Sequence, residues 1–220
     1  MIFTIVHGGV GCGVCAPSRL CHAGIRAVPR REYDSFVLSA MDSSLVRKRL
    51  EIFEGNVPHL YRCTGGAVTI GIGHAIPAAE AALGLPWTIG GRPATPQEIR
   101  KDYTRISSAP KGLVAGRYED LSRCRLSADA IDALAAADIA RFTGMIEGVL
   151  SNWARYPDCA QQALFDMGFN LGIAGLRKFG KLLAACDAGD WNTAARECHR
   201  MGISDDRNQQ TAALFRQALT

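Results

Sequence analysis

Residues 53–74 read FEGNVPHLYRCTGGAVTIGIGH, and the predicted organisation of the chain follows from this segment. Two short runs rich in residues that favour strands, 60–63 and 68–72, lie on either side of Gly65 and Gly66. A glycine pair between two such runs is typical of the turn of a β-hairpin. The segment therefore predicts a small antiparallel hairpin.

A helix is predicted directly before the hairpin. Apolar residues recur at helical spacing over residues 45–53, and Asp42 or Ser43 can cap the first turn. The pattern ends at Gly55, so Glu54 stands at the end of an apolar helix. Partial burial disfavours the charged form of a carboxyl group. Glu54 can therefore keep a proton near neutral pH, as a general acid must.

The composition excludes some classes of function. The 220 residues are 48% hydrophobic and 21% charged, which is ordinary for a globular protein, and the formal net charge is +4. No apolar run reaches the length of a membrane helix, so no membrane insertion is expected. No basic block interleaved with aromatic residues points to nucleic acid. The mild positive charge fits an anionic partner.

Residues 1–41 are predicted to be a disordered N-terminal extension, because they show no sustained helical or strand period. Four side chains there could in principle hold a metal ion: Cys12, Cys15, Cys21 and His22. The second, separated ligand pair that zinc sites contain is missing, so no metal is expected. Most of the other five cysteines are expected to be reduced thiols in the core.

The rest of the chain predicts helices. One helix is expected to begin after Thr95 as its cap, with Glu98 closing a capping box, and another after Ser127 as its cap. Further helices are expected over 77–85, 158–171, 176–188, 191–201 and 206–219. One hairpin and about seven helices make an α+β fold dominated by helix. Residues 42–220 are predicted to form one domain.

The segment around Glu54 resembles the phage-type lysozymes, glycoside hydrolase family 24. Glu54 is followed by glycine, Tyr61 stands seven residues later, and the run TIGIGH occupies residues 69–74. In that family, eight residues separate a catalytic Glu from an Asp or Cys, and five residues separate that Asp or Cys from a Thr. Glu54, Cys63 and Thr69 match this spacing without a gap.

A second block supports the resemblance. The run ALFDMGFNLG at residues 163–172 is similar to the buried helix of the family's C-terminal lobe, and GDW at 189–191 is similar to its next motif. Arg207 is similar to the family's arginine that lies close to the catalytic Glu. The resemblance covers about residues 42–220. It implies a two-lobe lysozyme-like fold, with a small β-hairpin lobe and a helical C-terminal lobe.

The resemblance also implies a role for each matching residue. Glu54 would be the general acid, and Thr69 would position the attacking water. The sugar substrate would contact two further residues, Asn170 and Gly71. Two residues would support the site, Arg207 by holding the Glu54 carboxylate and His74 by hydrogen bonding at the end of the hairpin. Neither a metal nor another cofactor is implied.

Cys63 leaves three alternatives open, because most of the family has Asp at this position. It can act as a thiolate beside a cation such as Arg62, which would lower the pKa of the thiol. It can be a passive replacement, with Glu54 and Thr69 carrying a slower reaction. A covalent glycosyl-thiol intermediate is the third alternative, and a water held by Thr69 argues against it.

The expected function is that of a muramidase, which cuts the β-1,4 bond between N-acetylmuramic acid and N-acetylglucosamine in peptidoglycan. The alternatives are a non-catalytic module that binds peptidoglycan or a partner protein, and a lytic transglycosylase. A monomer is expected that is made in the cytoplasm of a bacterial host and acts on the wall in the periplasm. A phage endolysin and a secreted antibacterial effector would share this domain.

Overall fold

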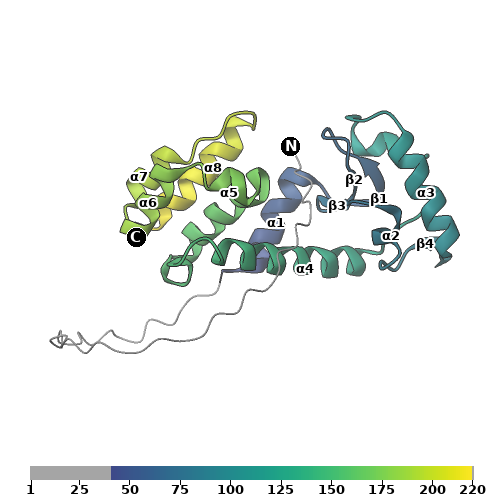
Figure 1. Ribbon diagram of the computed structural model, residues 1–220, viewed down its shortest axis with the longest axis horizontal. Helices are drawn as coiled ribbons and strands as arrows, with labels where there is room; N and C mark the ends of the chain where they lie inside the picture. The colour runs from purple at the N-terminus through teal and green to yellow at the C-terminus, as the bar shows by residue number, and fades with distance from the viewer. Residues whose placement is uncertain (1–40, 220) are drawn as a thin grey trace, which may run out of the picture. The chain divides into compact units, whose positions relative to one another are not determined.

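The computed structural model describes residues 41–219 (Figure 1). The predicted extension at residues 1–40 and the alternative metal ligands Cys12, Cys15, Cys21 and His22 lie outside these described residues. The strands are β1 (Val57–Arg62), β2 (Val68–Gly71), β3 (His74–Ile76), β4 (Thr88–Ile89) and β5 (Arg92–Pro93). The α-helices are α1 (Ser43–Glu54), α2 (Ala79–Ala82), α3 (Pro96–Ser108), α4 (Ala128–Glu147), α5 (Asp158–Leu176), α6 (Gly180–Ala188), α7 (Trp191–Glu197) and α8 (Asp205–Gln217). Two 3-10 helices are η1 (Ala115–Tyr118) and η2 (Trp153–Arg155).

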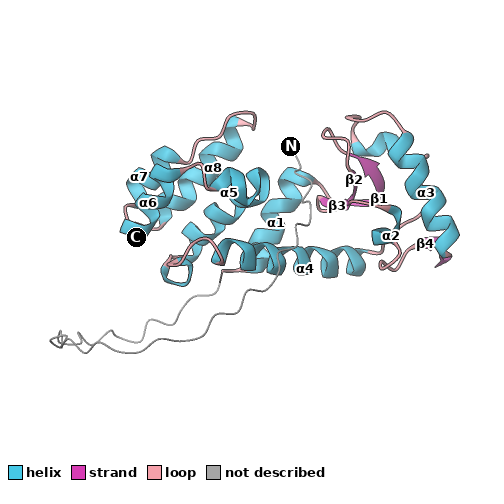
Figure 2. Ribbon diagram, in the orientation of Figure 1, coloured by secondary structure: helices cyan, strands magenta, loops and turns pink. Residues whose placement is uncertain are grey.

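The predicted hairpin is confirmed as β1 and β2, and β3 extends it to a three-stranded antiparallel sheet (Figure 2). In the turn between β1 and β2, the Cys63 N–H donates to the Ala67 carbonyl, and the Cys63 carbonyl accepts from the Gly66 N–H. Across the sheet, Thr69 lies opposite Tyr61 on one side and Ala75 on the other. The sequence missed β3, because three residues are too few to show strand alternation.

The predicted starts of three helices are also confirmed. The Asp42 carboxylate caps α1 by accepting from two N–H groups of the first turn. Thr95 and Glu98 form the predicted reciprocal capping box of α3, and the Ser127 hydroxyl caps α4. The buried residues of α4 recur at helical spacing, namely Ile131, Ala135, Ile139, Phe142 and Ile146. Capping residues and helical spacing therefore gave reliable local signals.

Several predicted boundaries are wrong. The helix predicted over 77–85 is reduced to α2, because no side chain caps its first turn and so short a helix gains little from hydrogen bonding alone. The glycine pair at 90–91 forms the turn between β4 and β5, two short strands that the sequence analysis did not predict. The helix predicted over 191–201 ends with α7, because the Asn208 side chain hydrogen-bonds both the N–H and the carbonyl of Arg200.

Helix α5 breaks where the predicted helix over 158–171 ends. Gly172 has a non-helical φ of +70°, and a further helical segment after this kink carries α5 on to Leu176. The helix predicted to begin at 176 consequently begins at Gly180, as α6. Residues 160–168 of α5 are all buried, including the polar residues Gln161, Gln162 and Asp166. A polar group in such a helix must find a partner inside the protein.

Helix α4 joins the parts of the described fold. It packs against α1 and α5 and also against β2 and β3. In Figure 1 the sheet, α2 and α3 lie toward one end of α4, and α5 to α8 lie toward the other. Helix α8 packs on both α5 and α7. This is the mostly helical α+β architecture that the sequence predicted.

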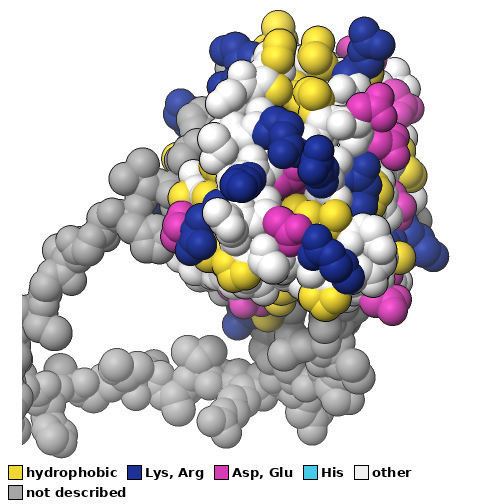
Figure 3. Space-filling view, turned by 90° about the vertical axis from the view of Figure 1, so that its right-hand side faces the viewer, with side chains coloured by type: hydrophobic (Ala, Val, Ile, Leu, Met, Phe, Trp, Pro, Cys, Tyr) yellow, Lys and Arg dark blue, Asp and Glu magenta, His cyan; other side chains and the backbone are white. Residues whose placement is uncertain are grey.

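The outer face around α3 carries many cations. Figure 3 shows this face, on which Lys and Arg side chains gather. Exposed basic residues between 92 and 125 include Lys101, Lys111, Arg117 and Arg123. None of the helices within residues 41–219 is long and apolar enough to cross a membrane. The five cysteines in this range are free thiols, four of them buried.

Candidate active site

Glu54 is the last residue of α1, and Gly55 ends the helix with φ at +77°. The Glu54 side chain is 22% exposed, so it is partly desolvated and still reachable. One carboxylate oxygen, Oε1, accepts a hydrogen bond from Nη1 of Arg207 at 3.1 Å. Arg207 belongs to the first turn of α8. The fold thus brings together two charged groups from opposite ends of the described chain.

The turn between β2 and β3 lies against the same carboxyl group. A Cβ built on Gly73 would lie 3.5 to 3.7 Å from Glu54 side-chain atoms, and Gly73 has φ at +76°. These distances are ordinary van der Waals contacts, so it is the left-handed backbone conformation that favours glycine there. Burial raises the pKa of the Tyr61 phenol, and Glu54 and Cys63 raise it further. Tyr61 therefore lies within electrostatic reach of both groups, and its phenol stays neutral.

Cys63 and Thr69 occupy the hairpin beside Tyr61. Cys63 is buried in the turn after β1, and Thr69 is wholly buried in β2. The Thr69 hydroxyl donates to the Ala67 carbonyl at 3.2 Å. A hydroxyl oxygen that donates its one hydrogen keeps lone pairs that can accept a hydrogen bond from water. Thr69 thus has a fixed hydroxyl orientation.

The cation expected beside Cys63 has other partners. Arg62 donates from Nε to the Gly66 carbonyl at 3.0 Å and from Nη1 to the Ala109 carbonyl at 2.6 Å. Its guanidinium therefore holds the hairpin turn against the segment after α3. Activation of the thiol by Arg62 gains no support from these contacts.

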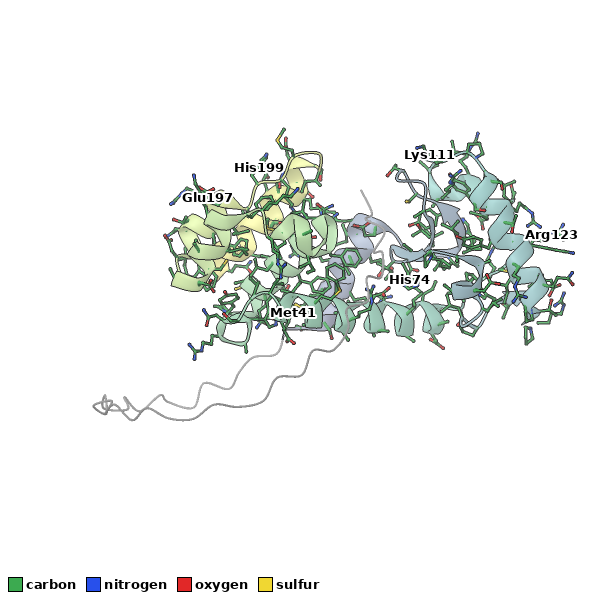
Figure 4. All side chains as sticks on the ribbon, viewed as in Figure 1. Met41, His74, Lys111, Arg123, Glu197 and His199 are labelled. Atoms are coloured by element: carbon green, nitrogen blue, oxygen red, sulfur yellow. The ribbon has the colours of Figure 1, made fainter. Side chains whose placement is uncertain are left out.

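His74 links the sheet to α4. Its Nδ1 lies 2.6 Å from Oδ2 of Asp138, and Arg141 donates to the other oxygen of Asp138 at 3.1 Å. Burial raises the pKa of Asp138, but the hydrogen bond and charge of His74, together with Arg141, outweigh it, so the pKa lies below its ordinary value. Figure 4 labels His74 on the sheet next to α4.

The two residues expected to contact sugar occupy different settings. Gly71 is buried at the end of β2 with φ at +62°, and a Cβ on it would lie 3.2 Å from Cγ2 of Ile131. Its glycine is explained by close packing on α4. Asn170 is partly exposed on α5, two residues before the Gly172 kink.

A buried carboxylate that the sequence analysis did not assign lies behind Arg207. Asp166 on α5 accepts from Nε and Nη2 of Arg207 on one oxygen, at 3.0 and 2.8 Å. Its other oxygen accepts from Nη2 of Arg200 at 2.7 Å and lies 3.1 Å from the Thr211 hydroxyl. One signal could have found it: an Asp inside a helix of otherwise low charge needs a cation.

The charges of this cluster stabilise one another. Burial raises the pKa of Asp166, but hydrogen bonds and charge from Arg207 and Arg200 outweigh it, and the net pKa is lowered. Burial lowers the pKa of Arg207, but Asp166 and Glu54 outweigh it, and the net pKa is raised. The Arg207 guanidinium also lies 4.6 Å from the centre of the Phe53 ring, a cation–π contact. Arg207 is thus held on three sides.

The arrangement is a carboxyl group at the end of α1, gripped by a fixed cation and faced by a small sheet. No cluster of His, Cys, Asp and Glu suited to a metal ion occurs within residues 41–219. A search of curated proteins gave no match to the chain. The family model described as Phage lysozyme matches residues 51–218, a range that includes Glu54, the sheet and Arg207. The chain therefore belongs to the phage lysozyme family, a family of peptidoglycan hydrolases.

Proposed function

We propose that the protein is a muramidase, which hydrolyses the β-1,4 bond between N-acetylmuramic acid and N-acetylglucosamine. The observation that carries the proposal is the setting of Glu54. Its carboxyl group is partly buried, held by Arg207 and faced by the turn between β2 and β3. A carboxyl group so placed can deliver a proton at a fixed point next to a bound glycan.

In the proposed reaction Glu54 gives its proton to the glycosidic oxygen as the bond from that oxygen to C1 breaks. A water molecule adds to C1 from the opposite face, which inverts the configuration there. Thr69 supports this step because its hydroxyl is oriented by Ala67 and its oxygen can accept from the water. The released proton of the water restores the carboxyl group of Glu54 through solvent.

Cys63 is proposed to assist the water and not to bond to sugar. Replacement by Asp would supply a carboxylate that is ionised at neutral pH, so Cys63→Asp should keep or raise the turnover rate. Cys63→Ala should lower it. A thiol-blocking reagent should inhibit to the extent that it reaches the buried sulfur. Equal rates for the native chain and Cys63→Ala would remove the thiol from the mechanism.

Peptidoglycan as a partner also agrees with the charge of the molecule. The wall polymer carries carboxylates, and the face around α3 carries exposed Lys and Arg side chains. Long-range attraction of this kind raises association rates and weakens with salt. Salt should therefore raise the concentration of peptidoglycan needed for half-maximal rate.

One pair of observations favours a second candidate, a lysozyme fold that binds peptidoglycan without cutting it. Cys63 occupies a position where a carboxylate would activate water more strongly than a thiol. Thr69 is wholly buried, and its hydroxyl hydrogen is already donated to the Ala67 carbonyl. In this candidate Glu54 and Arg207 would recognise the glycan and no bond would break.

Release of dye from labelled, purified peptidoglycan separates the two candidates. The native chain should release dye, and Glu54→Gln should release none while remaining folded and bound to the glycan. Glu51→Gln is the matched control, because Glu51 lies on the same helix and pairs with Arg47 and Asn56 instead of the site. It should keep the native rate. Binding without release by the native chain would favour the second candidate.

A further inference from the structure

Arg207 shares its donors unequally between two carboxyl groups. Asp166 receives two of its N–H donors, at 3.0 and 2.8 Å, whereas Glu54 receives one, at 3.1 Å. The Asp166 side chain is 4% exposed, against 22% for Glu54. The geometry of the cation is therefore set from the buried side.

The Arg207 cation poses a difficulty for the proposed chemistry. A positive charge about 3 Å from a carboxyl group favours the ionised form of that group. A general acid needs the protonated form before the reaction starts. Without a compensating charge, Arg207 would therefore favour the ionised form of Glu54, which has no proton to deliver.

We propose that Asp166 is a positioning residue that solves this difficulty. It aims the Arg207 guanidinium at Glu54 and offsets its positive charge, so that Glu54 can keep its proton while remaining fixed in place. Asp166 touches neither substrate nor reacting atoms. The inference rests on the proposed function, since it explains how Glu54 can serve as an acid beside a guanidinium.

Arg200 limits how far Asp166 can offset the positive charge of Arg207. Its side chain is wholly buried, and Nη2 donates both to Asp166 and to the Thr211 hydroxyl, each at 2.7 Å. With two guanidinium cations facing one Asp166 carboxylate, the cluster keeps a net positive charge when Glu54 is protonated. Removal of Asp166 would increase that charge, and removal of Arg200 would cancel it.

The other groups around Glu54 do not change in these comparisons. Tyr61 faces it from β1, and its buried phenol stays neutral. Cys63 lies in the following turn, and His74 with Asp138 lies beyond Gly73. On α1 itself, Glu51 and Arg47 pair with each other. A shift caused by changes at Asp166 or Arg200 therefore reports on the buried cluster.

The test is the titration of the Glu54 carboxyl group, followed by carbon-13 NMR in the full-length protein. The Glu54 signal is assigned by its loss in Glu54→Gln. In Asp166→Asn the midpoint should move to lower pH by about one unit, a tenfold change in proton affinity. In Arg200→Met it should move to higher pH. A structural role alone would not give opposite signs.

Arg200→Met also guards against loss of folding in Asp166→Asn. Nε of Arg200 makes no hydrogen bond within the described residues, so Met removes a buried group that is incompletely satisfied. If Asp166→Asn does not fold, the direction in which the Glu54 midpoint moves in Arg200→Met decides the inference by itself. Unchanged midpoints, or shifts of the same sign, would overturn the inference.

Kinetics give a second measurement. The alkaline limb of the kcat profile should move to lower pH in Asp166→Asn, with KM within about twofold of the native value, because the substrate contacts remain. A raised KM with an unmoved pH profile would contradict the inference. If the native chain cuts no glycan, the proposed function fails, and the NMR titration still decides the role of Asp166.

Discussion

Asp102 and Asp166 are both buried carboxylates on helices, and they are satisfied in different ways. Asp102 on α3 accepts from the backbone N–H groups of Arg123 and Cys124 and from the Ser122 hydroxyl. Its single cation, Arg105, is 38% exposed. Asp166 on α5 accepts chiefly from two guanidinium groups that are 0% and 8% exposed.

The difference separates a structural carboxylate from one coupled to a site. Backbone donors hold a loop in place, so Asp102 ties the segment after η1 to α3, and its charge acts locally, on Arg105 and on the buried Cys124 thiol. Buried guanidiniums carry full charge in a medium that screens it poorly. Asp166 is therefore the one of the two whose ionisation acts on Glu54, through Arg207.

Asp166→Ala should have the largest effect on stability. Removal of one partner from a buried ion pair leaves uncompensated charge inside the protein, a loss of about 3–5 kcal/mol in the free energy of unfolding. Urea denaturation at pH 7 measures it. A loss below about 1 kcal/mol would show that water or a backbone shift takes over from the carboxylate.

Asp102→Ala should cost less, about 2–3 kcal/mol, because it leaves buried N–H and hydroxyl groups without an acceptor while Arg105 remains solvated. It should leave the pH profile of hydrolysis unchanged, since no cation links it to Glu54. The same urea series and a kcat profile check both parts. If the alkaline limb of the kcat profile moved in Asp102→Ala, Asp102 would also be coupled to the site, and the two carboxylates would not differ in the way described.

Asp138 is an intermediate case, with His74 and Arg141 as its partners. Because its folded pKa is depressed, its contribution to stability is present above the unfolded value of about 3.9 and is lost as pH falls through the lower folded pKa. Native protein should therefore exceed Asp138→Asn in stability at about pH 5, above the unfolded pKa of the Asp138 carboxyl group. The gap should narrow below about pH 4. A gap that widens in acid would reverse the assigned sign.

Thr95→Ala should have the smallest effect, about 1 kcal/mol, because it removes an exposed cap from α3, the helix that carries Asp102. Thermal unfolding monitored by circular dichroism measures the loss. Thr95→Ser should recover it, since a serine hydroxyl can make the same bond to the Glu98 N–H.

The fold was more predictable than the site. Asp42, Thr95 and Ser127 mark helix starts through local chemistry, and Gly65 with Gly66 marks the hairpin, so sequence alone located these elements. The strand β3 was missed, because three residues are too few to show strand alternation. The predicted helix end at residue 171 coincides with the kink at Gly172, but the helical segment that follows the kink was not predicted.

In the site, the spacing of Glu54, Cys63 and Thr69 selected residues at the end of α1 and in the hairpin, and the resemblance placed Arg207 beside Glu54, to which its guanidinium donates. Neither pattern nor resemblance assigned Asp166 or Arg200. Their pairing requires α5, α8 and the segment between α7 and α8 to meet, which only tertiary structure shows. The burial of Thr69 was likewise invisible, since a strand residue can face either side.

The central claim is that Glu54 protonates a glycosidic oxygen while water attacks the sugar. Digestion of purified peptidoglycan in water labelled with oxygen-18, followed by mass spectrometry of the fragments, tests it most directly. The native chain should give N-acetylmuramic acid reducing ends that carry the heavy oxygen, and Glu54→Gln should give none. Anhydro-sugar ends without label, or labelled ends from Glu54→Gln, would contradict it.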